Sequence, residues 1–138
     1  MLTAQPGPRT ILIAERDQTV RELQRFFLAR EGFVVEFADD GESALALAAS
    51  LRPALLITEI LLPKLDGLTL CRRVRHDPVT RDTPVVVFSI LAAAARAAEA
   101  GASAFLRKPL VESIFVATVH RAIATESTGI MEQQWVTS

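Results

Sequence analysis

Residues 55–67 read LLITEILLPKLDG. The first four form an apolar run that is typical of a strand buried on both faces of a sheet. The run stops at Glu59, and Pro63 and the pair Asp66-Gly67 follow it. A charge at a strand end is usually a solvated turn residue, but a carboxylate here can also belong to a functional site. The ends of the other strands decide between these two interpretations.

Strand-like and helix-like segments alternate five times along the chain. The predicted strands cover residues 11–14, 33–37, 55–58, 85–88 and 104–107. Helices are predicted at about 17–31, from Asp40 to Arg52-Pro53, from Asp66 to about His76, at 92–100 and before residue 124, the last with Ile114, Ala117, Thr118 and Ile123 inward. Apolar strands separated by helical crossovers form a parallel sheet covered on both sides. The predicted fold is a doubly wound α/β sandwich.

The chain of 138 residues has the usual size of one domain, which we place at residues 10–124, with flexible segments at 1–9 and 125–138. Its net charge of −1 gives no general attraction to nucleic acid or to an anionic membrane surface. No apolar stretch is long enough to span a bilayer, and the N-terminus lacks a signal-peptide pattern, so the cytoplasm is the expected location. Trp135 is either loosely packed or available to a partner.

Polar residues follow four of the five predicted strands. In an open parallel sheet, ligands bind beyond the carboxyl ends of the strands, so these residues share one edge. They are two carboxylates, two cations and a hydroxyl: Glu15, Arg16, Glu59, Ser89 and Lys108. Their convergence favours a site over five unrelated turn residues.

With these residues in place, the chain resembles the receiver domains of two-component response regulators over about residues 10–124. The matching stretches are ILIAERD, LLITEILLPKLDG, VVVFSI and AGASAFLRKPL. The resemblance implies a flavodoxin-like five-stranded parallel sheet of order 2-1-3-4-5 with five helices. In that family an acidic pair and a phosphoaccepting aspartate hold Mg²⁺, and a hydroxyl and a lysine before a proline hold the phosphoryl oxygens.

Six positions match the family pattern, among them Asp66-Gly67 at the usual start of the third helix. Lys108-Pro109 and the hydroxyl of Ser89 stand where the phosphoryl oxygens are held. Phe105 occupies the place of the aromatic switch residue, whose ring turns inward or outward with activation.

Three positions depart from the pattern. Glu59 stands where the family has the phosphoaccepting aspartate, Glu15 and Arg16 stand where it has the acidic pair, and Ile90 stands where it prefers a small residue. Mg²⁺ needs several oxygen ligands, and a nearby arginine repels it. We therefore expect no cofactor and no metal unless Asp17 turns inward to join Glu15 and Glu59. The extra methylene of Glu59 also misplaces it as a nucleophile.

The altered pocket has several interpretations. One is a silent pseudo-receiver in which Glu59 pairs with Arg16 or Lys108. The second is a locked, active-like receiver in which Glu59 imitates the phosphorylated aspartate, and the third is residual phosphorylation. A different class, a flavodoxin-like flavin binder or small enzyme, is disfavoured because the loop AERDQ has no phosphate-cradling run.

We accordingly predict a non-enzymatic single-domain receiver in a phosphorelay that acts through protein contacts, independently of phosphorylation. The expected partner is a histidine kinase or a downstream effector, without nucleic acid or membrane. A homodimer can form through the helix at 92–100, the strand at 104–107 and the last helix. The run Arg72-Arg73-Val74-Arg75-His76 is interpreted as a solvated helix face, since cations are favoured at a helix C-terminus.

Overall fold

The computed structural model describes residues 9–128. Five strands alternate with five helices along the chain. The strands are β1 (Thr10–Ala14), β2 (Val34–Ala38), β3 (Leu55–Thr58), β4 (Val85–Ser89) and β5 (Ala104–Arg107), and the helices are α1 (Gln18–Arg30), α2 (Gly41–Leu51), α3 (Gly67–His76), α4 (Ala94–Glu99) and α5 (Glu112–Thr128). The tail residues 129–138, with Trp135, and residues 1–8 lie outside the described residues.

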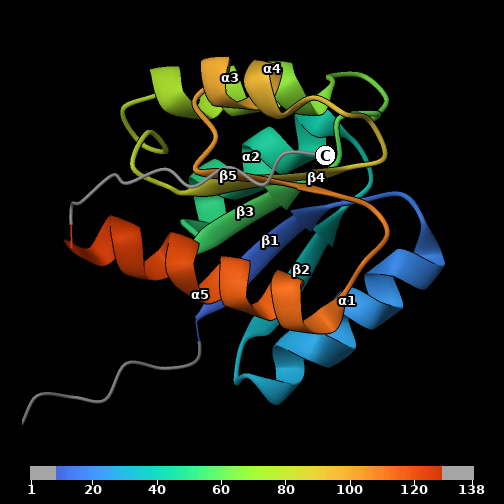
Figure 1. Cartoon of the computed structure of the whole chain (residues 1–138). Helices are drawn as coiled ribbons and strands as arrows, with labels where there is room; N and C mark the ends of the chain where they lie inside the picture. The colour runs from blue at the N-terminus through green and yellow to red at the C-terminus, as the bar shows by residue number, and fades with distance from the viewer. Residues whose placement is uncertain (1–8, 129–138) are drawn as a thin grey trace, which may run out of the picture.

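The strands form one parallel sheet of order β2-β1-β3-β4-β5, so the predicted doubly wound, flavodoxin-like sheet is confirmed. Figure 1 shows α1 and α5 on one face of this sheet and α2, α3 and α4 on the other. The order reverses between β1 and β3, and the carboxyl ends of these two strands carry Glu15 and Glu59. The topology therefore brings the two carboxylates together at the edge where such sheets bind ligands.

The core has two layers, one on each side of the sheet. Because successive side chains of a strand point to opposite faces, Ile11 and Ile13 pack toward α1 and α5, while Leu12 and Ala14 pack toward α2, α3 and α4. β3 is buried along its whole length. Its run of apolar residues is thus explained by a strand at the centre of a covered sheet.

Aspartate side chains begin three of the helices. Asp17, Asp40 and Asp66 each accept a hydrogen bond from a backbone N–H in the first turn of the helix that follows. Gly67, the first residue of α3, lies so close to the end of β3 that a Cβ atom there would meet the carbonyl oxygen of Glu59 at 2.1 Å. The Asp66-Gly67 pair therefore both starts α3 and lets it approach the loop that carries Glu59.

Some helix predictions were wrong in detail. The helix expected at 92–100 spans only Ala94–Glu99, since Ala93, with a φ of −135°, precedes it as the N-cap and Ala100 follows it as the C-cap. In α5, Ile114 and Ala117 are exposed, and the buried positions are Phe115, Thr118, Val119, Ala122 and Ile123. The helix also continues to Thr128, four residues beyond the expected end of the domain.

Candidate functional site

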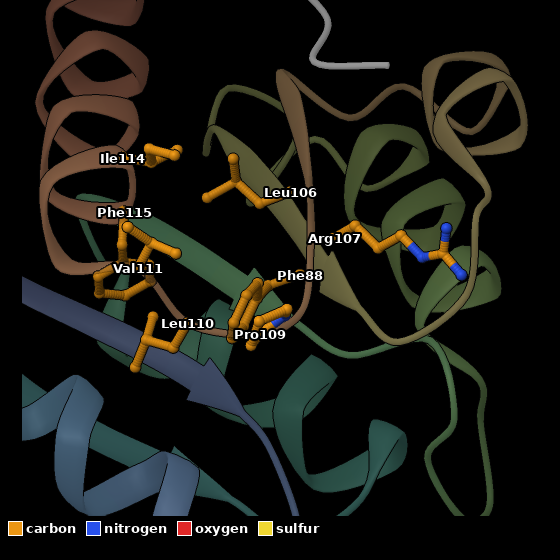
Figure 2. A pocket seen from close by; sticks show the side chains of 8 residues that line it. All are labelled: Phe88, Leu106, Arg107, Pro109, Leu110, Val111, Ile114 and Phe115. Atoms are coloured by element: carbon orange, nitrogen blue, oxygen red, sulfur yellow. The ribbon is translucent and has the colours of Figure 1, made fainter. Parts of the chain in front are cut away.

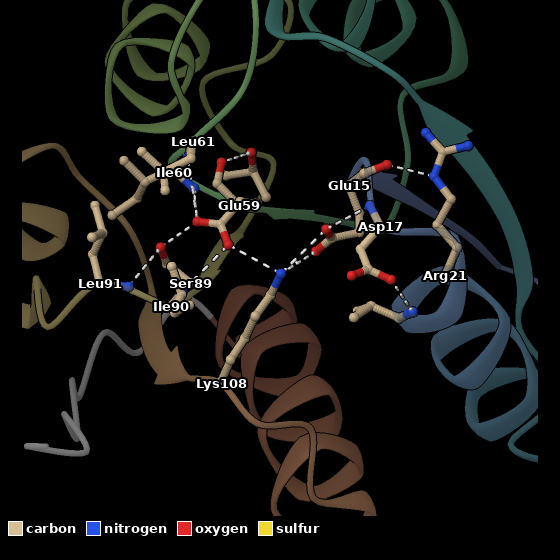
Figure 3. A network of polar contacts seen from close by, with 12 residues as sticks. Glu15, Asp17, Arg21, Glu59, Ile60, Leu61, Ser89, Ile90, Leu91 and Lys108 are labelled. Atoms are coloured by element: carbon tan, nitrogen blue, oxygen red, sulfur yellow. Dashed lines mark hydrogen bonds and ion pairs between the residues drawn. The ribbon is translucent and has the colours of Figure 1, made fainter.

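The carboxylate of Glu59 is the centre of a buried polar network at the carboxyl edge of the sheet (Figure 3). Its Oε1 atom accepts hydrogen bonds from the Ser89 hydroxyl and from the backbone N–H groups of Ile60 and Leu61, at 2.6 and 3.2 Å for the latter two. Its Oε2 atom accepts one from the N–H of Ile90 at 3.3 Å and lies 3.1 Å from Lys108 Nζ. Five donors from three loops thus surround one carboxylate.

Lys108 links this carboxylate to a second one, that of Glu15. The ammonium nitrogen lies 3.0 Å from Glu15 Oε1 and 3.2 Å from Glu15 Oε2. The contact with Oε2 has the geometry of a hydrogen bond, whereas the contact with Oε1 is an ion pair only. Oε2 also accepts from the backbone N–H of Asp17 at 3.1 Å. One cation between two buried carboxylates leaves the cluster with a formal charge of −1.

The network favours the charged forms of Glu59 and Lys108. Burial alone would raise the pKa of Glu59, but the hydrogen bonds from Ser89 and Lys108, the N–H of Leu61 and the charge of Lys108 outweigh it and lower that pKa below its usual value. Burial likewise acts to lower the pKa of Lys108, but the hydrogen bonds and charges of Glu15 and Glu59 raise it overall. Glu59 is therefore a carboxylate and Lys108 an ammonium at neutral pH.

Arg16, which was expected in the pocket, and Asp17, which could have turned inward to replace a missing ligand, both lie elsewhere. Arg16 is exposed, and within residues 9–124 its side chain makes no hydrogen bond or ion pair, so the ion pair foreseen for Glu59 is made by Lys108 alone. Asp17 does not turn inward, because its carboxylate accepts from the N–H of Val20 and starts α1. Arg16 was expected to oppose metal binding, but the cation that lies in the pocket is Lys108.

The residues present do not fit Mg²⁺, the metal that the resemblance implies. A magnesium site needs several oxygen ligands around one point. Here the Lys108 ammonium occupies the space between the carboxylates of Glu15 and Glu59, and Asp17 is engaged as a helix cap. Among the residues that the structure describes, no group of three or more His, Cys, Asp or Glu side chains could hold a metal ion.

The switch positions have definite arrangements. Ser89 at the end of β4 donates to Glu59 and accepts from the N–H of Leu91 at 3.2 Å, so the chain after β4 is tied to the pocket. The side chain of Ile90 is exposed while its N–H points to Glu59. Phe105 is fully buried in the core against α2, α3 and α4, which places its ring inward. Pro109 follows Lys108 through a cis peptide bond.

The backbone donors of the site could not be predicted from the residue types in the sequence. The N–H groups of Ile60, Leu61 and Ile90 supply three of the five contacts to Glu59, and any residue type except proline can supply an N–H. Arg21 was also missed. It donates to the carbonyl oxygens of Glu15 and Ala38 and so fixes the loop after β1.

The sequence model of the response regulator receiver domain matches residues 11–120 of the chain. The chain belongs to the receiver domain family. Its placement rests on the match over most of its length and on the sheet order observed here.

Curated relatives of this receiver are longer proteins. Response regulator PleD of Caulobacter vibrioides is 35% identical over 114 residues, which are 80% of this chain and 25% of PleD. Response regulator MprA of Mycolicibacterium vanbaalenii is 35% identical over 124 residues, 88% of this chain and 52% of MprA. The receiver thus spans between a quarter and about half of these relatives.

Solved structures agree on the fold. A candidate response regulator from Chloroflexus aurantiacus superposes with a TM-score of 0.81 at 37% identity, covering 85% of this chain and 98% of that one. The receiver domain of a signal transduction histidine kinase from Syntrophus aciditrophicus gives a TM-score of 0.78 at 29% identity and covers 94% and 98%. None of the described helices of the receiver is long and apolar enough to cross a membrane.

Proposed function

We propose that this receiver acts in two-component signalling through protein contacts and without being phosphorylated. We further propose that Glu59 keeps the pocket in the arrangement that a phosphoryl group imposes in the family. The inferred partner is a protein, either a histidine kinase or a downstream effector. Of the two interpretations of Glu59, the structure favours the imitation of the modified state over a silent ion pair.

The observation that carries the proposal is the set of donors around Glu59. A silent ion pair needs only Lys108, whereas this carboxylate also binds the Ser89 hydroxyl and the N–H of Ile90. By resemblance, the hydroxyl after the fourth strand and the lysine after the fifth are the groups that hold phosphoryl oxygens. The extra methylene of Glu59 lets its oxygens reach both groups without any added phosphate.

The same contacts argue against phosphoryl transfer to Glu59. Both carboxylate oxygens are already engaged, and Lys108 lies where a divalent cation would have to neutralise the incoming phosphate. Phosphoryl transfer depends on an in-line nucleophile and on neutralised charge, and neither requirement is met. The inward ring of Phe105 and the contact between Ser89 and Glu59 are one of the arrangements that the family's switch can take.

Intact-mass spectrometry after incubation with a small phosphodonor and Mg²⁺ tests the first half of the proposal. The unmodified protein is expected to gain no phosphoryl group. The double variant Glu59→Asp/Arg16→Asp is expected to gain one, because the shorter side chain at position 59 leaves Ser89 and the N–H of Ile90 free and the added carboxylate at position 16 offsets the charge of Lys108. Glu59→Asn/Arg16→Asp is the matched control, since it restores the second acid without a nucleophile. Phosphorylation of the unmodified protein would contradict the proposal.

Amide hydrogen exchange measured by NMR tests the second half. In the unmodified protein, the N–H groups of Ile90 and Leu91 are expected to exchange slowly because they bond to Glu59 and Ser89. Glu59→Asn shortens the side chain and removes its charge, so both amides are expected to exchange at least tenfold faster. Unchanged exchange in this variant would mean that Glu59 does not hold the loop, and the silent interpretation would then replace this one.

A further inference from the structure

A second pocket lies away from the polar network, between β4, β5 and the start of α5 (Figure 2). Its volume is about 190 Å³. Three of its lining side chains are buried, those of Phe88, Leu106 and Phe115. Two others, Val111 and Ile114, are 47% and 49% exposed at the rim. The pocket is therefore an apolar hollow with a buried floor and an open side.

The charges around the pocket favour a neutral occupant. Among the described residues that line it, Arg107 is the only charged one. Its guanidinium is already used, since Arg107 Nε donates to the carbonyl oxygen of Ile90 at 3.2 Å. Figure 2 shows this side chain pointing away from the apolar lining residues. A charged molecule would lose its hydration in the pocket without gaining a partner there, which is unfavourable.

The size of the pocket limits the size of the occupant. An apolar cavity of about 150 Å³ binds benzene, whereas drug-sized ligands occupy pockets of about 300–1,000 Å³. The volume of about 190 Å³ lies close to the smaller value. The rings of Phe88 and Phe115 have centres 5.9 Å apart and are tilted by 49°, an arrangement into which a further aromatic ring can pack. The pocket therefore fits a molecule with a single ring.

The pocket shares residues and chain neighbours with the network around Glu59. Phe88 lines the pocket and directly precedes Ser89, and the Lys108 ammonium lies 5.6 Å from the centre of the Phe88 ring. Pro109 also lines the pocket, and it directly follows Lys108. A molecule packed against Phe88 and Pro109 therefore restricts the motion of the two residues that donate to Glu59 from β4 and from the loop after β5.

We propose that this pocket binds a small, neutral, apolar molecule with one ring, and that the bound molecule stabilises the Glu59 network. The inference rests on the proposed function, in which Glu59 rather than a phosphoryl group holds the loop after β4. It gives a receiver that is not phosphorylated a chemical signal of another kind. Coupling between two sites is reciprocal, so a molecule that stabilises the network also binds more tightly when the network is intact.

Fluorobenzene is a suitable probe, because it is neutral, has one ring and reports its own binding by fluorine NMR. It is expected to bind the unmodified protein with a dissociation constant of about 1 mM or lower. Benzoate, which has the same ring and a charge, is expected to bind about tenfold more weakly or worse. Ile114→Glu puts a charge at the rim and is expected to weaken fluorobenzene binding by about tenfold or more. Leu23→Glu is the matched control, since Leu23 is a helical aliphatic residue on α1 with similar exposure, 42%.

Amide hydrogen exchange measured by NMR tests the coupling. Saturating fluorobenzene is expected to slow exchange of the N–H groups of Ile90 and Leu91, which bond to Glu59 and Ser89, by about threefold or more. The N–H of Ser43 is the control, because it bonds to Asp40 at the start of α2, on the opposite face of the sheet from α5. By reciprocity, Glu59→Asn is expected to weaken the binding of fluorobenzene by about threefold.

Each outcome decides for or against the proposal. Binding that is lost in Ile114→Glu, kept in Leu23→Glu and weakened in Glu59→Asn supports it. Absence of binding overturns it, as does binding that survives in Ile114→Glu or that slows the amides near Glu59 no more than that of Ser43. An affinity that falls as the protein concentration rises also overturns it and assigns the pocket to a second copy of the chain.

Two further measurements keep the test unambiguous. Circular dichroism verifies that each variant is folded, and Val111→Glu replaces Ile114→Glu if the latter is not. Phosphorylation of the unmodified protein, seen by intact mass, would contradict the proposed function but would not change whether fluorobenzene binds. Failure of the proposed function and failure of the pocket are thus distinguished.

Discussion

At the scale of single residues, Glu59 shows how one methylene changes a site. The buried carboxylate reaches the Ser89 hydroxyl and the Ile90 N–H, and it is neutralised by Lys108. Burying a charge is costly unless hydrogen bonds and an opposite charge compensate for it. Glu59 meets both conditions, so its charge can be kept in the buried pocket, and removing any one of its partners is costly.

Glu59→Gln is expected to lower the free energy of unfolding by about 1–3 kcal/mol. The amide removes the negative charge beside Lys108, and its NH₂ group has to face either another donor or the ammonium. Chemical denaturation at pH 7 measures the change. Glu42→Gln is the control, because Glu42 is an exposed carboxylate on α2, and it is expected to change stability by less than about 0.5 kcal/mol. Equal effects of the two variants would mean that Lys108 and the hydrogen bonds do not compensate for the buried charge of Glu59.

Lys108→Met is expected to cost more, about 3–5 kcal/mol, because it leaves the carboxylates of Glu15 and Glu59 buried and without their shared cation. Adding Glu15→Gln to Lys108→Met removes one of the two uncompensated charges and should recover part of the loss. A double-mutant cycle in urea measures the recovery. An additive result, with no recovery, would show that Lys108 does not couple to Glu15.

The sequence predicted the site well where side chains define it. Glu59, Ser89 and Lys108 each end a strand, and parallel strands bring such residues to one edge. The prediction that Arg16 lies in the pocket was wrong, because the direction of a side chain just after a strand depends on how the next helix starts, here at Asp17. It could not indicate the backbone donors, because an N–H carries no residue identity.

At the scale of the elements, the sheet was easier to predict than the helix faces. All five predicted strands agree with the structure to within about one residue. β3 and β4 are buried along their whole length, and their runs of apolar residues leave little choice of boundary. Helix faces were less certain. In α1, Leu23 is exposed and the buried position next to it belongs to Gln24. Likewise Arg75, placed by its neighbours in a solvated run, is half-buried and donates to three carbonyl oxygens, those of Gly101, Arg81 and Thr83.

Arg75→Met is therefore expected to destabilise the receiver by about 2–4 kcal/mol, since it leaves carbonyl groups between α3, β4 and β5 without donors. Arg73→Met is the matched control, because Arg73 is an exposed residue of the same helix. Thermal denaturation of both variants measures the difference. If the two melting temperatures fall equally, Arg75 is a surface residue in solution and the structural role assigned to it is wrong.

Gln24→Leu is expected to have the opposite sign. Gln24 is fully buried, and neither its Nε2 nor its Oε1 atom has a hydrogen-bond partner within the described residues. A buried amide without partners costs about 1–3 kcal/mol, which an apolar side chain of similar size avoids. The variant should raise the melting temperature by several degrees. A lower melting temperature would indicate that a water molecule or another partner satisfies Gln24 in solution.

At the scale of the whole molecule, the ionisable groups that hydrogen bonds or burial perturb set how stability depends on pH. The pKa values of Glu59, Asp40 and Asp66 lie below their usual values. For Asp40 the backbone hydrogen bond from Ser43 is the largest cause, whereas for Asp66 hydrogen bonds from Thr69 and Leu68 outweigh the effect of burial. Groups with lowered pKa values stabilise the fold above their unfolded pKa of about 4, and this contribution is lost as the pH falls further.

At alkaline pH, stability depends on Cys71, whose thiol lies on the buried face of α3. Burial raises its pKa to about 11, against a small opposing effect of Arg75 and Arg72. A raised pKa contributes stability that is complete below the unfolded value, about 8.5–9, and is lost as the pH rises toward 11. The free energy of unfolding should therefore fall by about 2–3 kcal/mol between pH 8.5 and pH 11 on account of this thiol.

Urea denaturation at half-unit pH steps measures this slope, and Cys71→Ala identifies its source. The variant is less stable at every pH because it loses a buried sulfur, but its stability should change less between pH 8.5 and pH 11 than that of the unmodified protein. Lys108, whose pKa is also raised, begins to lose its contribution only above its unfolded pKa of about 10.4, and it is present in both proteins, so the difference in slope reports on Cys71. Parallel curves for the two proteins would mean that the thiol ionises as easily in the folded chain as in the unfolded one, and that the packing of α3 on the sheet is looser than the structure indicates.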